Sequence, residues 1–96
     1  MTERRIAVVT GSTSGIGLGV ARALAKAGHD IVLNGFGDAG EIEKLRAGMA
    51  EEFDVTVTFQ DVDMSKPDAI AAMMAAIEAE HGAIDVLVNN AGIQFV

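Results

Sequence analysis

Four short runs rich in β-branched apolar residues alternate along the chain with three longer segments of helical spacing. The apolar runs are Ile6–Thr10, Ile31–Asn34, Val55–Gln60 and Ile84–Asn89. The helical segments lie near Gly15–Ala27, near Gly40–Glu52 and from Ser65 onward. Strict alternation of strands and helices with short connections is typical of a parallel sheet covered by helices. The sequence therefore predicts one α/β domain with the element order β-α-β-α-β-α-β.

Right-handed crossovers and a doubly wound arrangement predict the strand order 3-2-1-4, which is a Rossmann-like doubly wound parallel sheet. In the third run, Val and Phe alternate with Thr56 and Thr58, so we expect this strand at an edge of the sheet. The first and fourth strands then become neighbours, and the winding reverses between their ends. In folds of this kind the ligand sits in the crevice at that point.

Each helical segment carries an apolar stripe that we expect to face the sheet. The stripes are Ile16, Val20 and Leu24 in the first segment, Ile42, Leu45, Met49 and Phe53 in the second, and Ile70, Met73 and Ile77 in the third. We expect the third helix to start at Ser65, with Asp68 completing a capping box and Pro67 in the first turn. Gly28 and Gly82 stand where a glycine commonly ends a helix.

The composition limits the partners that this chain can have. Its 96 residues carry seven Lys and Arg against fourteen Asp and Glu, a formal charge of −7. Nucleic acid and anionic membranes are therefore not expected partners, because both need clustered basic side chains. The chain has no cysteine, and its longest apolar stretch, Ala69–Ile77, is about half of a membrane span. We expect a cytoplasmic location.

The stretch Thr10–Gly17, which reads TGSTSGIG, joins the first strand to the first helix. Gly11 allows a tight turn, Gly15 lets the backbone approach a ligand, and Gly17 allows the helix to pack closely on the sheet. The free N–H groups and the dipole at the start of the helix favour an anion, and a pyrophosphate fits this position. The loop is not a P-loop, because Leu18 follows Gly17 where that motif has lysine. A glycine-rich turn without any ligand is the alternative.

Two motifs make the chain resemble the short-chain dehydrogenase/reductase family. Thr10–Gly17 matches the T-G-x-x-x-G-I-G cofactor loop of that family, and Asn89–Gly92 matches its N-N-A-G motif after the fourth strand. The resemblance covers the whole chain. It implies that residues 1–96 are the N-terminal part of a dinucleotide-binding Rossmann domain.

The loop and the resemblance together give a set of candidate cofactor contacts. They are Gly11, Ser12, Thr13, Ser14, Gly15, Ile16 and Gly17 in the first loop, Asn34 and Phe36 after the second strand, Asp61 and Val62 after the third, and Asn90, Ala91 and Gly92 after the fourth. The Asp61 carboxylate can accept from the amino group of adenine, and Val62 can pack on the ring. Asp61 as a solvated loop acid, and Asn90 as a turn former, are the alternatives.

NAD is the expected cofactor, in preference to NADP. A 2′-phosphate requires a nearby cation, but no Lys or Arg occurs between Lys26 and Lys44, and Asp38 adds negative charge there. By the resemblance, Ser14 stands where NADP-using members often have a basic residue. The usual ribose-binding acid at the end of the second strand is replaced by Asn34-Gly35-Phe36, so the way in which the ribose is bound stays open.

Within the family, the stretches IVLNGFGD and NNAGIQ are most similar to the bacterial 3-hydroxybutyrate dehydrogenases. This resemblance implies a small hydroxy acid as substrate, with the Gln94 amide binding its carboxylate. Phe95 differs from the histidine that is common in that group. Gln94 as an ordinary surface residue is the alternative.

Hydride transfer in the family uses a Ser, a Tyr and a Lys four residues after the Tyr, with the Tyr as acid and base. This chain contains no tyrosine, so we assign no catalytic residue and expect the chain alone to be inactive. We assign no metal site, and His29 and His81 are interpreted as structural. The alternatives are a non-catalytic nucleotide-binding or partner-binding module, and a fragment too incomplete to bind NAD.

The fourth strand, with Val86-Leu87-Val88, has the apolar composition of a strand buried on both faces. In the family, another strand pairs beside it. We therefore expect the free edge to promote self-association into a homo-oligomer.

Overall fold

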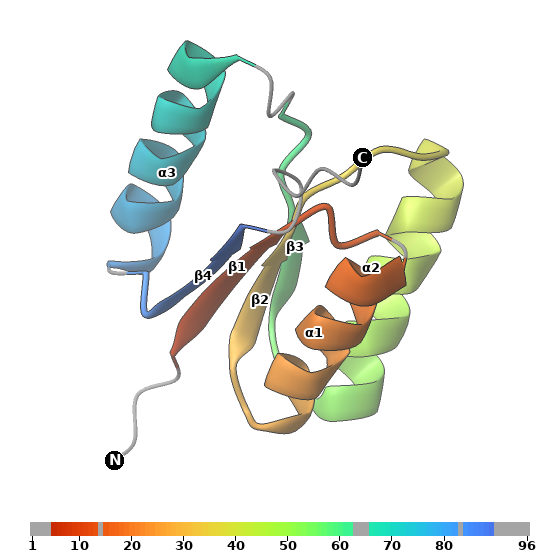
Figure 1. The fold of residues 1–96 in the computed structure, drawn as a ribbon. Helices are drawn as coiled ribbons and strands as arrows, with labels where there is room; N and C mark the ends of the chain where they lie inside the picture. Colours follow the sequence, from red (N-terminus) through yellow and green to blue (C-terminus); the bar gives the residue numbers. More distant parts are fainter. Residues whose placement is uncertain (1–4, 14, 63–65, 83, 90–96) are drawn as a thin grey trace.

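A computed structural model describes residues 5–13, 15–62, 66–82 and 84–89 of the chain. Its elements in chain order are β1 (Ile6–Thr10), α1 (Gly15–Lys26), β2 (Asp30–Leu33), α2 (Ala39–Phe53), β3 (Val57–Phe59), α3 (Pro67–His81) and β4 (Val86–Asn89). The strands form one parallel sheet in the order β3-β2-β1-β4 (Figure 1). The predicted Rossmann-like topology is confirmed, including the edge position of the third strand.

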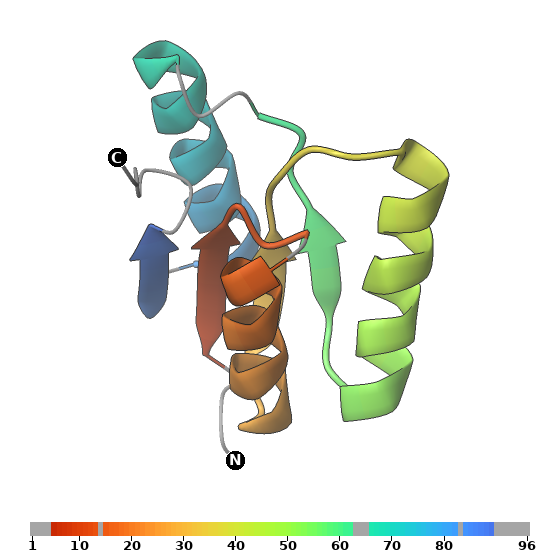
Figure 2. The same cartoon turned by 45° about the vertical axis from the view of Figure 1, so that its right-hand side comes forward.

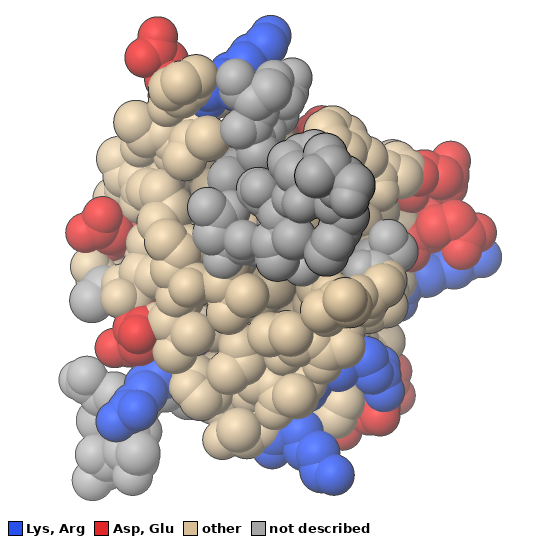
Figure 3. All heavy atoms as spheres, viewed as in Figure 1, with Lys and Arg blue, Asp and Glu red and all other residues tan. Residues whose placement is uncertain are grey.

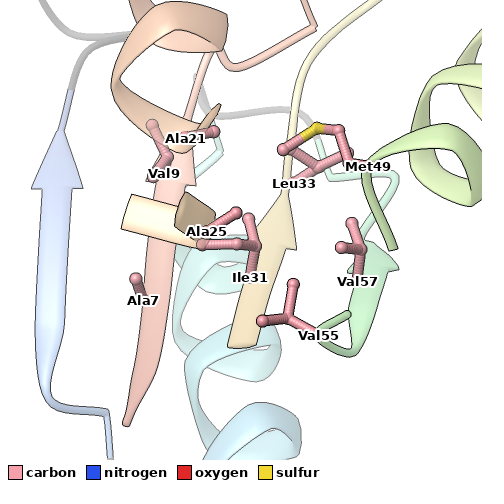
Figure 4. Close-up of a cluster of buried hydrophobic side chains, with 9 residues drawn as sticks. All are labelled: Ala7, Val9, Ala21, Ala25, Ile31, Leu33, Met49, Val55 and Val57. Atoms are coloured by element: carbon pink, nitrogen blue, oxygen red, sulfur yellow. The ribbon is translucent and has the colours of Figure 1, made fainter. Parts of the chain in front are cut away.

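The sheet is covered on both faces, by α1 and α2 on one side and by α3 on the other (Figures 1 and 2). Side chains alternate along β1, so Ala7 and Val9 pack toward α1 and α2 while Ile6 and Val8 pack toward α3. All five residues of β1 are buried. Figure 4 shows the larger of the two clusters, where β1, β2 and β3 meet α1 and α2.

The face that α1 buries differs from the predicted one. Its buried residues are Gly17, Ala21 and Ala25, and Ile16 is 72% exposed. Small side chains on this stripe let the helix axis come close to β1 and β2, so the larger Leu24 packs at the margin of the core. The predicted stripe is therefore correct only in part: Val20 and Leu24 are partly buried against the core, whereas Ile16 is exposed.

The other two helices bury the predicted residues. In α2, Ile42 and Met49 are buried, and Leu45 and Phe53 are partly buried. In α3, Met73 and Ile77 form the centre of the second cluster.

The start of α3 also differs from the prediction. The helix begins at Pro67, and Lys66 occupies the N-cap position with extended backbone angles (φ −112°, ψ 104°) and no side-chain cap. A residue before proline is driven out of the helical region by the proline ring, which explains why Lys66 stays outside the helix. The predicted start at Ser65 is therefore wrong, and the predicted capping box rests on Ser65, which lies outside the described residues. The predicted glycines do end helices, since Gly28 and Gly82 have φ values of 98° and 95°.

The first strand coincides with its apolar run, whereas the third and fourth strands are shorter than theirs. The third strand loses Val55 and Thr56 to the turn after α2, which Asp54 closes in the left-handed region (φ 55°). The second strand begins one residue early, at Asp30, and ends before Asn34. Its last residue is therefore Leu33, and Asn34 opens the loop toward α2.

Candidate functional site

The loops after β1, β2 and β3 all leave the sheet at its carboxyl edge, where the four strand arrows point in Figure 2. The side chain of Thr10, at the end of β1, donates to the Val88 carbonyl of β4 at 3.4 Å. β1 and β4 are directly paired, so the winding of the chain reverses between these two strands, as the sequence predicted.

The glycine loop has the backbone that its sequence predicted. Gly11 and Gly15 have φ values of 60° and 61°, a region that residues with a Cβ rarely adopt. A Cβ built on Gly15 would meet no atom within 4 Å, so the space above the first residue of α1 is open. Gly17 is buried, as expected for close packing of the helix on the sheet. The loop thus leads from a buried strand into the N-terminus of α1 through two glycines whose backbone other residues rarely adopt.

The polar groups of Ser12 form hydrogen bonds within the protein. The residue is fully buried, and its N–H donates to the Asn34 carbonyl at 2.6 Å. Its Oγ accepts from the Asn34 N–H at 3.0 Å and lies 3.2 Å from the Asn34 carbonyl. Ser12 thus joins the glycine loop to the end of β2, and its predicted contact with a cofactor stays a prediction.

Thr13 makes a second link between the same two loops. Its Oγ1 donates to the Phe36 carbonyl at 2.9 Å. A Cβ on Gly35 would lie 2.6 Å from this hydroxyl oxygen, so the two loops can approach this closely only with glycine at position 35. The ring of Phe36 remains 78% exposed beside them.

Asn34 forms hydrogen bonds to two other loops at the carboxyl edge, and its side chain is buried. It is 1% exposed, and its Nδ2 donates to the carbonyls of Gln60 and Val62, both at 3.0 Å. Between these two acceptors lies Asp61, which is exposed, and Val62 is partly buried against the α3-side core. The structure therefore brings Asp61 to the same edge as the glycine loop, through Asn34.

An open cavity of about 270 Å³ lies between the loop after β2 and the first turns of α1 and α2. Its lining residues are Thr13, Leu18, Phe36, Gly37, Asp38, Glu41, Ile42 and Leu45. Asp38 caps α2, and its carboxylate accepts from the Glu41 N–H at 3.0 Å. The lining of the cavity therefore combines apolar side chains with two acidic residues.

The prediction from sequence missed two of these roles. Asp38 was assessed only as a charge near the ribose, although the spacing D-x-x-E from Asp38 to Glu41 is a capping-box signature. The hydrogen-bonding role of Asn34 had no local signal, because its partners are 22 to 28 residues away. Five candidate residues lie outside the described residues. These are Ser14, Asn90, Ala91, Gly92 and Gln94.

The charged side chains do not gather into a basic field on the face shown in Figure 3, where Lys and Arg of the described residues are scattered around the rim next to acidic groups. His29 bonds to the Leu24 carbonyl through Nδ1 at 3.1 Å, and His81 lies at the end of α3. Within the described ranges, no cluster of three or more His, Asp or Glu side chains is arranged to hold a metal ion. Over the same ranges, no helix has the length and apolar character needed to cross a membrane.

Comparison with known proteins places this geometry in a family. The sequence model of the short chain dehydrogenase family matches residues 5–96 of the chain. A D-beta-hydroxybutyrate dehydrogenase from Rhizobium meliloti (strain 1021) is 54% identical over 92 residues, which are 96% of this chain and 36% of the relative. The chain thus spans about a third of the length of this curated relative.

Two solved structures have the same arrangement. A short-chain dehydrogenase/reductase from Sinorhizobium meliloti 1021 superposes with a TM-score of 0.87 at 42% identity, covering 99% of this chain and 43% of that one. The L-sorbose reductase of Gluconobacter frateurii, solved with NADPH and L-sorbose, has a TM-score of 0.85 at 35% identity and covers 97% and 35%. Strand order, glycine loop, family model and solved relatives agree, and the chain belongs to the short-chain dehydrogenase/reductase family.

Proposed function

We propose that this chain forms the NAD-binding portion of an oxidoreductase that transfers hydride between NAD and a small hydroxy acid or alcohol. The observation that carries the proposal is the left-handed backbone of Gly11 and Gly15, in the loop that joins β1 to the N-terminus of α1, with open space where a Cβ of Gly15 would lie. A Cβ would project into this space, and the residue's φ of 61° excludes most side chains from it. The loop therefore has the form of a cradle for a phosphate group bound by backbone N–H groups.

The residues of the carboxyl edge fit a dinucleotide. The start of α1 would hold the pyrophosphate, Asp61 and Val62 would lie beside the adenine, and Phe36 would flank the adenosine ribose. The bound nicotinamide would supply the hydride acceptor or donor. The protein's own part is to bind and orient the cofactor, because the chain has no tyrosine for the family's acid–base step.

NAD is the proposed cofactor, rather than NADP. The cavity beside Phe36 carries Asp38 and Glu41 at its rim, and both carboxylates would repel a 2′-phosphate. The NADPH bound to L-sorbose reductase belongs to that protein. Because this relative was solved with NADPH, the ratio of the affinities for NAD and NADP is the property to measure.

Calorimetric titration of the purified protein tests the cofactor directly. We expect NAD to bind at least about tenfold more tightly than NADP, which corresponds to about 1.4 kcal/mol. Absence of heat with both cofactors, confirmed by equilibrium dialysis, would refute nucleotide binding. Tighter binding of NADP would refute the cofactor choice and leave the fold assignment intact.

The proposed substrate of the whole protein is a small hydroxy acid, with 3-hydroxybutyrate as the first compound to test. The support is the 54% identity to a D-beta-hydroxybutyrate dehydrogenase, together with Gln94 as the candidate carboxylate ligand. For the 96-residue chain alone we expect no formation of NADH from 3-hydroxybutyrate. Turnover above the buffer rate by a preparation of this mass would show that other residues replace the tyrosine.

A non-catalytic module that binds a nucleotide or a partner is the second candidate. One observation favours self-association, since Leu87 in the edge strand β4 is 53% exposed. Sedimentation at several concentrations tests this property. We expect a homo-oligomer, and a single monomeric species at all concentrations would contradict the expectation.

A further inference from the structure

One buried residue connects the loops after β1, β2 and β3. Asn34 is 1% exposed, yet each loop it contacts has surface residues. Its backbone bonds to Ser12 in the first loop, and its side chain bonds to the turn after β3.

The side chain of Asn34 closes the turn around Asp61. Its Nδ2 donates to the Gln60 carbonyl and to the Val62 carbonyl, each at 3.0 Å. The Val62 N–H also donates to the Gln60 carbonyl, at 3.1 Å. With both neighbouring carbonyls held, the backbone of Asp61 has little freedom, while its carboxylate stays in solvent.

The backbone of Asn34 holds the glycine loop in the same way. Its carbonyl accepts the Ser12 N–H at 2.6 Å, and its N–H donates to the Ser12 Oγ at 3.0 Å. Ser12 directly follows Gly11, where the chain turns out of β1. The glycine loop and the Asp61 turn are thus both placed relative to one residue.

We infer that Asn34 is a positioning residue, which couples the pyrophosphate loop to the adenine-side turn without touching the cofactor itself. This inference rests on the proposed function, because the two loops matter together only if one dinucleotide spans them. An apolar side chain could fill the same volume, but it would leave the Gln60 and Val62 carbonyls without their donor. Directional bonds in a buried site specify one geometry, which packing alone does not.

The experiment compares NAD with nicotinamide hypoxanthine dinucleotide, which lacks the adenine amino group that Asp61 would accept from. For the unaltered protein we expect NAD to bind about tenfold more tightly than this analogue, as one hydrogen bond to a carboxylate allows. In Asn34→Ala, and equally in Asp61→Ala, we expect this ratio to fall to about twofold. In the double variant this affinity ratio should fall no further, because both substitutions remove the same contact with the adenine amino group.

Two control variants separate positioning from general loss of stability. Val32→Ala opens a cavity in β2, where Val32 is 1% exposed and packs on the α3 side, without removing a loop bond. It should retain the tenfold ratio. Ser12→Ala should weaken both ligands by the same factor, roughly fivefold, because it affects the phosphate side that the two ligands share.

A measurement on the unaltered protein completes the test, in case the Asn34 variant does not fold. Coupling between a ligand and the bonds that position its site is reciprocal, so NAD should slow hydrogen exchange of the Asn34 side-chain NH₂ group, and the analogue should slow it less. A ratio that survives in Asn34→Ala, equal binding of both ligands to the unaltered protein, or exchange unchanged by saturating NAD would each overturn the inference. If the unaltered protein binds neither ligand, the proposed function itself fails.

Discussion

The sheet has an amino edge, where its strands begin, and a carboxyl edge, where they end. Different kinds of side chain hold the strand ends together at these two edges. At the amino edge, Asp30 Oδ1 accepts the Thr56 N–H and Asp85 Oδ2 accepts the Ile6 N–H, both at 2.9 Å. At the carboxyl edge the same task falls to the neutral side chains of Ser12 and Asn34. Each edge thus uses side chains to bind backbone groups of a neighbouring strand or loop. Among the described residues, the side chains that do so are carboxylates of Asp30 and Asp85 at the amino edge and the neutral groups of Ser12 and Asn34 at the carboxyl edge.

The difference matches what the carboxyl edge has to bind. A carboxylate about 4 Å from a phosphate costs about 1 kcal/mol in water and several times more in a partly buried site. Neutral amide and hydroxyl groups hold the loops without that repulsion. The five residues of β1 separate the two edges by roughly 13 Å, which exceeds the screening length of about 8 Å at physiological salt. Acids at the amino edge therefore do little to an anion at the other edge.

The largest expected effect comes from filling the carboxyl edge. Gly15→Val places a β-branched side chain at φ 61° and in the open space above α1. We expect loss of measurable NAD binding by calorimetry and a decrease of about 1–2 kcal/mol in the free energy of unfolding, the cost of the left-handed region. The matched control is Gly19→Ala in the same helix, where a Cβ also meets nothing within 4 Å and no positive φ occurs. This control should bind NAD normally, and unchanged affinity in Gly15→Val would refute the loop assignment.

The next effect separates stability from binding at the amino edge. Asp85→Ala and Asp30→Ala each leave a backbone N–H without its carboxylate, and we expect each to lower the free energy of unfolding by about 1 kcal/mol in urea denaturation. The affinity for NAD, titrated at a temperature where the variants are folded, should stay within about twofold of the original. Asp85→Asn keeps an acceptor oxygen and should lose less stability than Asp85→Ala. A tenfold loss of NAD affinity in either variant would show that the two edges are coupled after all.

Features that depend on neighbouring residues in the sequence could be predicted, whereas contacts between residues far apart in the sequence could not. The strand order could be predicted because the alternation of apolar runs is a local pattern, and the glycine loop because φ values near 60° restrict residue type. The stripe predicted for α1 is only partly buried, because the spacing of large apolar residues does not show that Gly17, Ala21 and Ala25 pack closest to the sheet. The network around Asn34 was beyond reach, since an Asn after a strand has the same local signature as a turn residue.

A smaller effect concerns the acidic rim beside Phe36, where Asp38 has two separable roles. Asp38→Ala removes the cap of α2 and should cost about 1 kcal/mol of unfolding free energy. Asp38→Ser keeps a capping oxygen and removes the charge, so stability should stay within a few tenths of a kcal/mol. In both variants the preference for NAD over NADP, measured by competitive titration, should narrow about threefold. A preference unchanged in Asp38→Ser would assign the discrimination to other groups.

The smallest expected effect lies at the lateral edge of the sheet, away from both strand ends. Arg46 donates to the Val57 carbonyl of β3 at 3.0 Å and pairs with Glu43 on α2. The hydrogen bond that Arg46 donates to the Glu43 carboxylate holds the pKa of Glu43 below its usual value of 4.5. A carboxyl whose pKa is lower in the folded protein stabilises the fold above that usual value, and the contribution disappears as the pH falls through the folded pKa. Glu43→Gln should therefore be less stable than the original at pH 6 in urea denaturation, and this difference should be smaller near pH 3. The difference at pH 6 should also shrink in high salt, because the pair is exposed. The affinity for NAD should not change at either pH. A stability difference of the same size at both pH values would show that packing of the Glu43 stem, and not its charge, acts on the edge strand.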